Sequence, residues 1–349
     1  MFFASDNTGP VAPEIMAALT QANSGYAMAY GNDQATTELT TRIREIFEAP
    51  DAVTYLVSTG TAANALALAT LTQPWQAIFC SRDAHINVSE ANAPEFFSAG
   101  AKLVAVDGPS GKIDPRALET AMSAIETGGL KNTQRGPVSL TQVTDFGAVY
   151  SLGELRAVTG VAKAFGAQCH MDGARFANAL AALNVSPAEM SWKSGIDALS
   201  FGGTKNGLMG VDAVIFFDPA HAQEFQLRRM RGAHLLSKHR FLAAQMLAYL
   251  TDDLWLNLAT RANAAAARLE LALATVPELE FQHKRDANMI FARWPRHLHQ
   301  RAKAAGAQYG PGQEGSPGGG GGDLLSARLV CNWVTTDAEI ESFAALLRA

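Results

Sequence analysis

Short apolar runs alternate with longer Ala- and Leu-rich segments over roughly the first 220 residues of the chain. A run without alternating polar positions is typical of a strand that is buried on both faces, with helices covering those faces. The pattern therefore predicts an α/β fold with a mainly parallel sheet. The predicted strands are 52–58, 76–81, 102–107, 136–143, 167–172, 197–201 and 212–217, with helices at 61–71 and 152–166.

The pattern changes after about residue 235. Two long helical segments, 237–250 and 253–276, precede two strand candidates, 288–294 and 327–334. We therefore expect two domains: a large one over 1–235, which includes the N-terminal segment, and a smaller α+β domain over 236–349. The Gly-rich stretch 310–323 lacks the strand-to-helix setting of a phosphate loop, so it is predicted as a flexible loop without a function.

Composition and charge exclude several classes of function. Of the 349 residues 48% are hydrophobic and 17% charged, which is typical of a globular protein. The net charge of −5, with no basic block, argues against nucleic-acid binding. We expect no signal peptide, no membrane span and no metal site, because none of their patterns occurs. Three widely spaced cysteines, Cys80, Cys169 and Cys331, favour the reducing cytoplasm.

Chemistry-bearing residues follow several predicted strands at their carboxyl ends, where parallel sheets bind ligands. The first group is Ser58-Thr59-Gly60-Thr61, which leads directly into an Ala-rich helix. Free backbone N–H groups at a helix start, with hydroxyls beside them, bind phosphate well. The alternative is an ordinary Ser/Thr N-cap.

Asp172 closes the strand 167–172, where an unpaired carboxylate is costly. It therefore needs a cationic partner, which is either Arg175 or the protonated ring nitrogen of a ligand. His85 follows another strand, either as a surface residue or as a flat ring that stacks on a flat ligand. Lys205 follows Thr204 in the stretch SFGGTKNG. Its neighbouring glycines leave room for a molecule that reacts with the amine; otherwise Lys205 is a solvated loop residue.

Together these strand ends supply a phosphate cradle, a stacking imidazole, a carboxylate for a pyridinium nitrogen and a lysine for an imine. Those are the protein's contributions to pyridoxal phosphate chemistry. The combination indicates that pyridoxal 5'-phosphate is the cofactor, with Lys205 forming the Schiff base and Asp172 holding the ring nitrogen protonated.

The whole chain resembles the low-specificity L-threonine aldolases, which have the aspartate-aminotransferase fold, known as fold type I. The motifs that carry the resemblance are SDNTGP (5–10), YGNDQAT (30–36), STGTAAN (58–64), DAHI (83–86), HMDGARFANA (170–179), SFGGTKNG (200–207), RRMRGAHLLSKHRFLAAQ (228–245) and ARLVCNWVTT (327–336). One departure is the stretch SLTQVTDFGAVYSL, which lacks the second active-site histidine of many family members. That contact is either absent or made by another residue, such as Gln142.

The resemblance implies a retro-aldol cleavage of β-hydroxy-α-amino acids, such as L-threonine and L-allo-threonine, to glycine and an aldehyde. It assigns the cofactor site to Ser58, Gly60, Thr61, His85, Asp172, Arg175, Thr204 and Lys205. Substrate contacts are expected from Ser5, Tyr30, Arg175, Arg231 and Arg328.

In this interpretation Arg328 binds the substrate carboxylate, and His85 acts as the base, directly or through a water. Arg175 pairs with the cofactor's ring oxygen or with Asp172. A neighbouring subunit of the implied homotetramer, which has its active sites at subunit interfaces, supplies Arg231.

Three other interpretations stay open at this point. The first is an aldolase specialised for phenylserine or another bulky substrate. The second is another fold-type-I enzyme, such as a β-eliminating lyase or an aminotransferase, which shares the lysine and aspartate. The third is a non-catalytic binding protein with a degenerate site, against which the intact Lys205, Asp172 and Arg328 argue.

Overall fold

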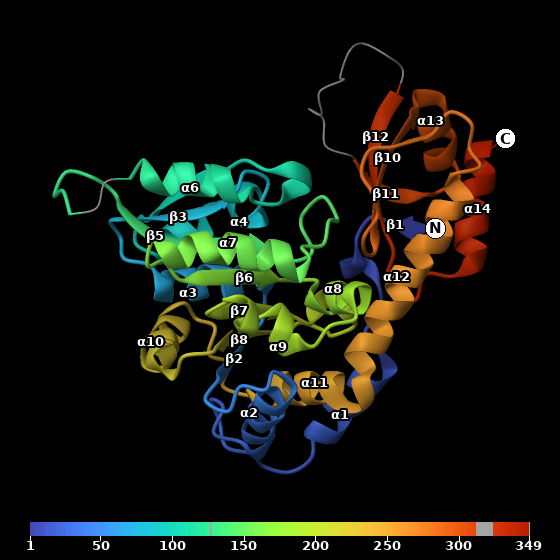
Figure 1. Ribbon diagram of the computed structural model, residues 1–349. Helices are drawn as coiled ribbons and strands as arrows, with labels where there is room; N and C mark the ends of the chain where they lie inside the picture. The colour runs from blue at the N-terminus through green and yellow to red at the C-terminus, as the bar shows by residue number, and fades with distance from the viewer. Residues whose placement is uncertain (126–127, 312–323, 349) are drawn as a thin grey trace.

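A computed structural model describes residues 1–125, 128–311 and 324–348 of the chain. It contains a seven-stranded sheet with the order β2-β8-β7-β6-β5-β3-β4 and a five-stranded sheet with the order β1-β11-β12-β10-β9. In Figure 1 the long helix α12 runs from the helices around the large sheet to the small sheet. Both chain ends lie beside the small sheet (Figure 1).

The large sheet is formed by the strands that the apolar runs predict. Strand β8 pairs antiparallel with β2 and β7, and the remaining pairs are parallel. The prediction of a mainly parallel α/β sheet is confirmed. The strands are β2 (Val53–Val57), β3 (Gln76–Ser81), β4 (Lys102–Val106), β5 (Gln134–Thr141), β6 (Cys169–Gly173), β7 (Ala198–Gly202) and β8 (Asp212–Phe216).

Helices cover both faces of this sheet, so every second residue of a central strand faces each helical layer. In β7, Leu199 belongs to the same buried cluster as residues of α6, α7 and α8, whereas Ala198 belongs to a second cluster with residues of α3 and α10. The helices are α1 (Pro13–Ala22), α2 (Gln34–Ile46), α3 (Gly60–Leu71), α4 (His85–Val88), α5 (Ala93–Phe97), α6 (Pro115–Ser123), α7 (Leu152–Ala164), α8 (Phe176–Leu183), α9 (Pro187–Met190), α10 (Ala222–Arg231), α11 (Arg240–Leu250), α12 (Leu254–Leu273), α13 (Arg296–Ala304) and α14 (Asp337–Arg348).

The small sheet joins the two ends of the chain. Its strands are β1 (Phe2–Phe3), β9 (Glu280–Phe281), β10 (Met289–Pro295), β11 (Gln308–Pro311) and β12 (Leu324–Val330). We expected the N-terminal segment within the large domain, but β1 pairs in parallel with β11 of the small sheet. The physical reason is that Phe3 is fully buried in the small-sheet core, where its ring contacts Phe343 of α14. A domain boundary at residue 235 stays a prediction.

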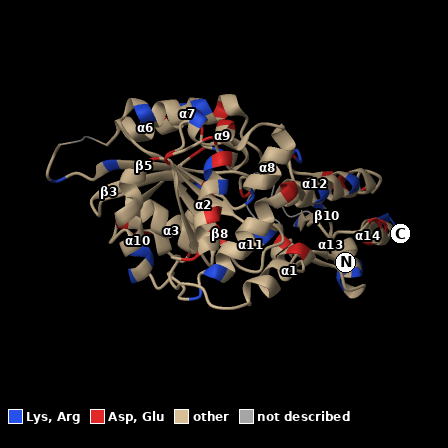
Figure 2. Ribbon diagram, turned by 90° about the horizontal axis from the view of Figure 1, so that it is seen from below, with Lys and Arg blue, Asp and Glu red and all other residues tan. Residues whose placement is uncertain are grey.

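Charged residues are interspersed over the helices and loops, whereas the strands of the large sheet carry few (Figure 2). None of the described helices combines the length and the apolar character of a membrane span. In the same residues, no three His, Cys, Asp or Glu side chains form a group that could hold a metal ion. The three cysteines are buried thiols without disulfides. Most of the predicted Gly-rich loop, 312–323, lies outside the described residues.

Candidate active site

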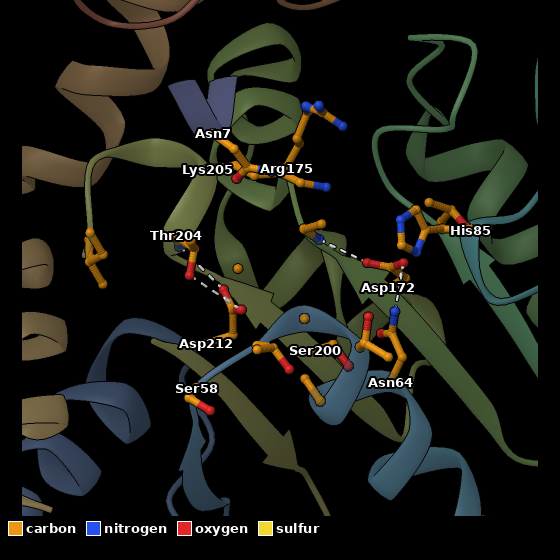
Figure 3. Close-up of a pocket in the computed structure, with 18 of the residues that line it drawn as sticks. Asn7, Ser58, Asn64, His85, Asp172, Arg175, Ser200, Thr204, Lys205 and Asp212 are labelled. Atoms are coloured by element: carbon orange, nitrogen blue, oxygen red, sulfur yellow. Dashed lines mark hydrogen bonds between the residues drawn. The ribbon is translucent and has the colours of Figure 1, made fainter. Parts of the chain in front are cut away.

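A cavity of about 410 Å³ lies where β2, β6 and β7 end and where α3 begins. It brings together predicted residues from four separate motifs (Figure 3). The predicted residues that line it are Ser58, Gly60, Thr61, His85, Asp172, Arg175, Thr204 and Lys205. The strand-end rule therefore located the cavity correctly, and the role of each residue in it remains a proposal.

The start of α3 presents unbonded backbone donors to the cavity. Thr59 is extended, and its hydroxyl accepts a hydrogen bond from the Ala62 N–H at 3.2 Å. Its carbonyl accepts the Ala63 N–H at 3.1 Å. The N–H groups of Gly60 and Thr61 have no partner among the described residues. Two free donors at a helix N-terminus suit an anion such as a phosphate group.

Lys205 is positioned by the tight turn that follows the buried strand β7. A buried Asp212 carboxylate accepts the backbone N–H groups of Gly203 at 2.7 Å and Thr204 at 3.3 Å, which fixes the turn. A Cβ at Gly202 would lie 2.6 Å from the Ala174 carbonyl oxygen, and one at Gly203 would lie 2.8 Å from that of Val211. Close packing of the protein itself therefore requires these two glycines, whereas we had expected them to make room for a ligand.

Asp172 is a buried carboxylate without a cationic partner. One of its oxygens accepts the Asn64 amide at 2.9 Å, and the other accepts the Ala174 N–H at 3.0 Å. Among the described residues no cation lies within ion-pair distance of it. A buried carboxylate is costly in this state, so the site is suited to a ligand that brings a positive charge.

Arg175 is not the partner of Asp172, contrary to one of our two expectations. Its guanidinium instead binds Asp6 through two hydrogen bonds of 2.6 and 2.9 Å. Both side chains are largely buried. Burial alone would raise the pKa of Asp6, but the Arg175 charge and hydrogen bonds, together with Lys205, hold it below its usual range. This pair ties the N-terminal segment to the rim of the cavity.

His85 is connected to Asp172 through two intermediate side chains. Its Nδ1 lies 2.7 Å from Oε1 of the buried Glu90. The Asn64 amide donates both to that oxygen and to Asp172, each at 2.9 Å. Figure 3 shows His85 beside Asp172, with Asn64 on the other side of the carboxylate. The hydrogen bond with Glu90 raises the pKa of His85 despite its partial burial. We did not predict Glu90, which lies in an unremarkable polar turn.

Asp145 also lines the cavity, although we did not predict it either. It comes from the stretch that lacks the family's second histidine. Gln142, which we suggested as a substitute, is fully buried and lies outside the cavity lining. Its amide instead bonds the Tyr150 backbone, donating to the carbonyl at 3.0 Å and accepting the N–H at 2.9 Å. The suggested role of Gln142 is therefore wrong.

Four predicted residues do not line the cavity of this chain. Ser5 caps a short helical turn, where its hydroxyl accepts the Asn7 N–H at 3.2 Å. Tyr30 is exposed, and Arg231 lies in a separate surface hollow beside Phe96. Arg328 is half-buried on β12, near enough for the charges of Arg175, Asp6 and Asp145 to affect it.

Arg328 has an unusual environment for an arginine. One guanidinium nitrogen donates to the Ala4 carbonyl at 3.2 Å, and its buried Nε has no hydrogen-bond partner in the part of the chain that the structure describes. No carboxylate among the described residues forms an ion pair with it. Burial, followed by the nearby charge of Arg175, lowers its pKa. A desolvated arginine in this state is suited to an incoming carboxylate.

Comparisons with known proteins decide the family. The family model described as "Beta-eliminating lyase" matches residues 3–294. The chain belongs to the beta-eliminating lyase family. A curated relative from Pseudomonas sp. (strain NCIMB 10558), named low specificity L-threonine aldolase, is 38% identical over 99% of this chain and 97% of its own length.

Solved structures show the fold of this family member. The threonine aldolase of Leishmania major has a TM-score of 0.91 and 23% identity, covering 99% of this chain and 98% of its own. A serine palmitoyltransferase structure with pyridoxal phosphate has a TM-score of 0.68 and 14% identity, covering 100% of this chain and 86% of its own. The chain therefore has the pyridoxal phosphate fold type I, as expected.

The residues present in this lyase fit pyridoxal phosphate. Within the described ranges, the N–H groups of Gly60 and Thr61 are unbonded donors that suit the phosphate, and Asp172 lacks the positive charge that a protonated pyridine nitrogen would supply. The Lys205 amine lies in the same cavity and has no hydrogen bond or ion pair with any described residue. The phosphate, the ring nitrogen and the reactive carbon of the cofactor would thus each find a suitable protein group.

The Asp6–Arg175 pair yields a first prediction. Asp6→Asn leaves a buried, unpaired guanidinium, so we expect the free energy of unfolding to fall by about 3–5 kcal/mol at neutral pH. Because the pKa of Asp6 is lowered in the folded protein, its contribution is lost as the pH falls through that value, below the usual aspartate range. Urea unfolding between pH 7 and pH 3 should show the wild-type advantage shrinking in acid.

The control is Asp107→Asn, which removes a carboxylate from an exposed ion pair with Arg82. Such an exposed pair is screened by solvent and contributes little to stability, so its loss should be much smaller than that of the buried pair. Equal losses in the two variants would mean that the buried pair has no special role in stability.

Proposed function

We propose that this protein is a pyridoxal phosphate-dependent aldehyde-lyase. It cleaves L-threonine, L-allo-threonine and related β-hydroxy-α-amino acids to glycine and an aldehyde. The observation that carries the proposal is the buried Asp172 carboxylate, which shares a cavity with the amine of Lys205. Within the described parts of the chain, Asp172 has no cationic partner and the Lys205 amine has no ion pair or hydrogen bond. The aldolase name of a relative that matches the full length of the chain gives the reaction class.

The chain's own residues bind and orient the cofactor. The N–H groups of Gly60 and Thr61, with the hydroxyls of Ser58 and Thr204, bind its phosphate. Asp172 keeps the proton on the ring nitrogen, and His85 covers one face of the ring. Lys205 holds the cofactor covalently through its amine. When bound, pyridoxal phosphate supplies a sink for the electron pair left on the substrate Cα.

Arg328 binds the substrate carboxylate from the small-sheet side of the cavity. Its desolvated guanidinium can form two parallel hydrogen bonds with a carboxylate, which fixes orientation as well as position. This orientation aligns the Cα–Cβ bond for cleavage. Arg175 keeps its charge through Asp6 and contributes a second positive group at the rim.

A homotetrameric, cytoplasmic enzyme acting on small molecules is part of the proposal. Tyr30 is exposed and has a left-handed backbone conformation (φ 59°). Its N–H donates to the Ser237 carbonyl, which stabilises this conformation. Tyr30 and Arg231 are exposed and lie outside the cavity of this chain. In the proposed tetramer they contribute to the cavity of a neighbouring subunit. The buried free thiols agree with a reducing compartment.

Product analysis tests the proposed reaction against its alternatives. The purified protein, incubated separately with L-threonine, L-allo-threonine and phenylserine, should release glycine and the matching aldehyde in equal amounts. Ammonia and a keto acid without glycine would indicate a β-eliminating lyase. Conversion that depends on an added keto acid would indicate an aminotransferase, and a colourless protein without turnover would indicate a binding protein.

Arg328 provides the prediction for the substrate carboxylate. We expect Arg328→Lys to bind the cofactor normally but to lose about two powers of ten in kcat/KM, because a lysine cannot reproduce the paired hydrogen bonds. The matched control is Arg293→Lys on the neighbouring strand β10, where the arginine pairs with Glu280 at the surface. Steady-state kinetics with L-threonine measure both. If Arg328→Lys retains wild-type kcat/KM, another residue binds the carboxylate.

A further inference from the structure

Asp145 is held in the cavity by a fixed turn. The Thr144 N–H donates to the Ala148 carbonyl at 2.9 Å, which closes the turn around Asp145. The Thr144 hydroxyl in turn donates to the Ser110 carbonyl at 2.8 Å. One carboxylate oxygen of Asp145 accepts the His85 backbone N–H at 3.1 Å. The other oxygen has no hydrogen-bond partner among the described residues, so it is available to a ligand.

The surroundings of Asp145 favour a carboxyl group that gains and loses a proton near neutral pH. Burial raises its pKa to about 6, and the negative charge of Asp172 acts in the same direction. Positive charges oppose this shift and keep the value from rising further. The groups that face it with positive charge are His85, Lys205, Arg175 and Arg328. A base with a pKa near the working pH is effective in proton transfer.

His85 is less suited to accept a proton. Its Nδ1 is in a 2.7 Å hydrogen bond with the buried Glu90, and this bond raises the pKa of the ring. A ring that is protonated more readily is less available as a base, and its bond to Glu90 restrains it as a stacking group. The free oxygen of Asp145 has neither restriction.

We propose that Asp145 accepts the proton of the substrate β-hydroxyl group and thus takes the place of the histidine that this chain lacks. The O–H bond breaks and its proton passes to the Asp145 carboxylate. The electron pair of the broken O–H bond forms the aldehyde C=O bond while the Cα–Cβ bond breaks. The electron pair of the Cα–Cβ bond remains on Cα. Protonation of Cα gives glycine, and Asp145 releases its proton to solvent. This inference rests on the proposed function and names its base.

The test compares two reactions of one holoenzyme. Asp145→Asn preserves size and removes the proton acceptor, so L-threonine cleavage should fall about 10²–10⁴-fold in kcat. Exchange of a glycine Cα proton with deuterated water requires the cofactor, Lys205 and Asp172 but no β-hydroxyl, so it should stay within a few-fold of wild type. The cofactor absorbance spectrum and the affinity for O-methylthreonine, measured by spectral titration, should not change.

The wild-type kcat for cleavage should rise with pH through about 6 as Asp145 loses its proton. The residual cleavage by Asp145→Asn should lack this rise. The matched control is Asp286→Asn, which removes a carboxylate that accepts the Val149 N–H at 3.1 Å in the same loop but does not line the cavity. Its cleavage and exchange rates should both stay near wild type.

Three outcomes would overturn the inference. The inference fails if Asp145→Asn keeps cleavage within a few-fold of wild type, if it loses exchange together with cleavage, or if it changes the cofactor spectrum. The first result would mean that Asp145 is not needed for cleavage. The other two would mean that Asp145 maintains the structure of the site and does not accept the proton. None of these outcomes contradicts the proposed function, which fails only if the wild-type protein releases no glycine from β-hydroxy amino acids.

Discussion

The buried carboxylate of Asp172 is the constraint on which the site depends. A negative charge at the end of a buried strand is unfavourable unless a positive charge compensates for it. The neighbouring cation Arg175 binds Asp6, and the donors that Asp172 receives from the described residues are the neutral groups of Asn64 and Ala174. The fold therefore leaves a position for a cationic ring nitrogen, and the remaining groups of the cavity surround that position.

The connection between the two sheets determines where the positive charges of the cavity lie. The first strand of the chain pairs in the small sheet, and the segment after it carries Asp6 back to Arg175. The same segment supplies the Ala4 carbonyl that contacts Arg328. Arg175 lines the cavity, and Arg328 lies beyond its lining on β12 of the small sheet, within reach of the charge of Arg175. Of these two arginines, Arg175 alone has a carboxylate partner among the described residues. This difference gives the two arginines different roles.

Much of the site follows from the sequence because it depends on local order. Apolar runs locate the strands, and the polar residues directly after them locate the carboxyl edge of the sheet, so Ser58, Asp172 and Lys205 are predictable. Glu90 is not, although it lies only five positions from His85, because its turn has no pattern that marks it. Asp6 and Asp145 are not, because each meets the site through contacts distant in sequence. Asp6 lies 169 positions from Arg175, and Asp145 lies 60 positions from His85. Periodicity carries no information about such pairs.

The small sheet shows the same limit. Two of its strands, β10 and β12, are apolar enough to predict, whereas β1 is only two residues long and has no pattern of its own. The position of β1 depends on the burial of Phe3 against Phe343 of α14. This contact joins opposite ends of the chain, so the local sequence does not predict it. Similarly, the glycines before Lys205 in the sequence suggest that the fold leaves space for a ligand. In the structure, the backbone of Ala174 occupies that space beside Gly202.

The central claim is that the missing counter-ion of Asp172 is a protonated pyridine nitrogen. Nitrogen-15 NMR of the protein reconstituted with pyridoxal phosphate labelled at the ring nitrogen measures this directly. The account predicts the chemical shift of a protonated nitrogen in the wild type and that of a neutral nitrogen in Asp172→Asn. A neutral ring nitrogen in the wild-type protein at neutral pH would contradict it.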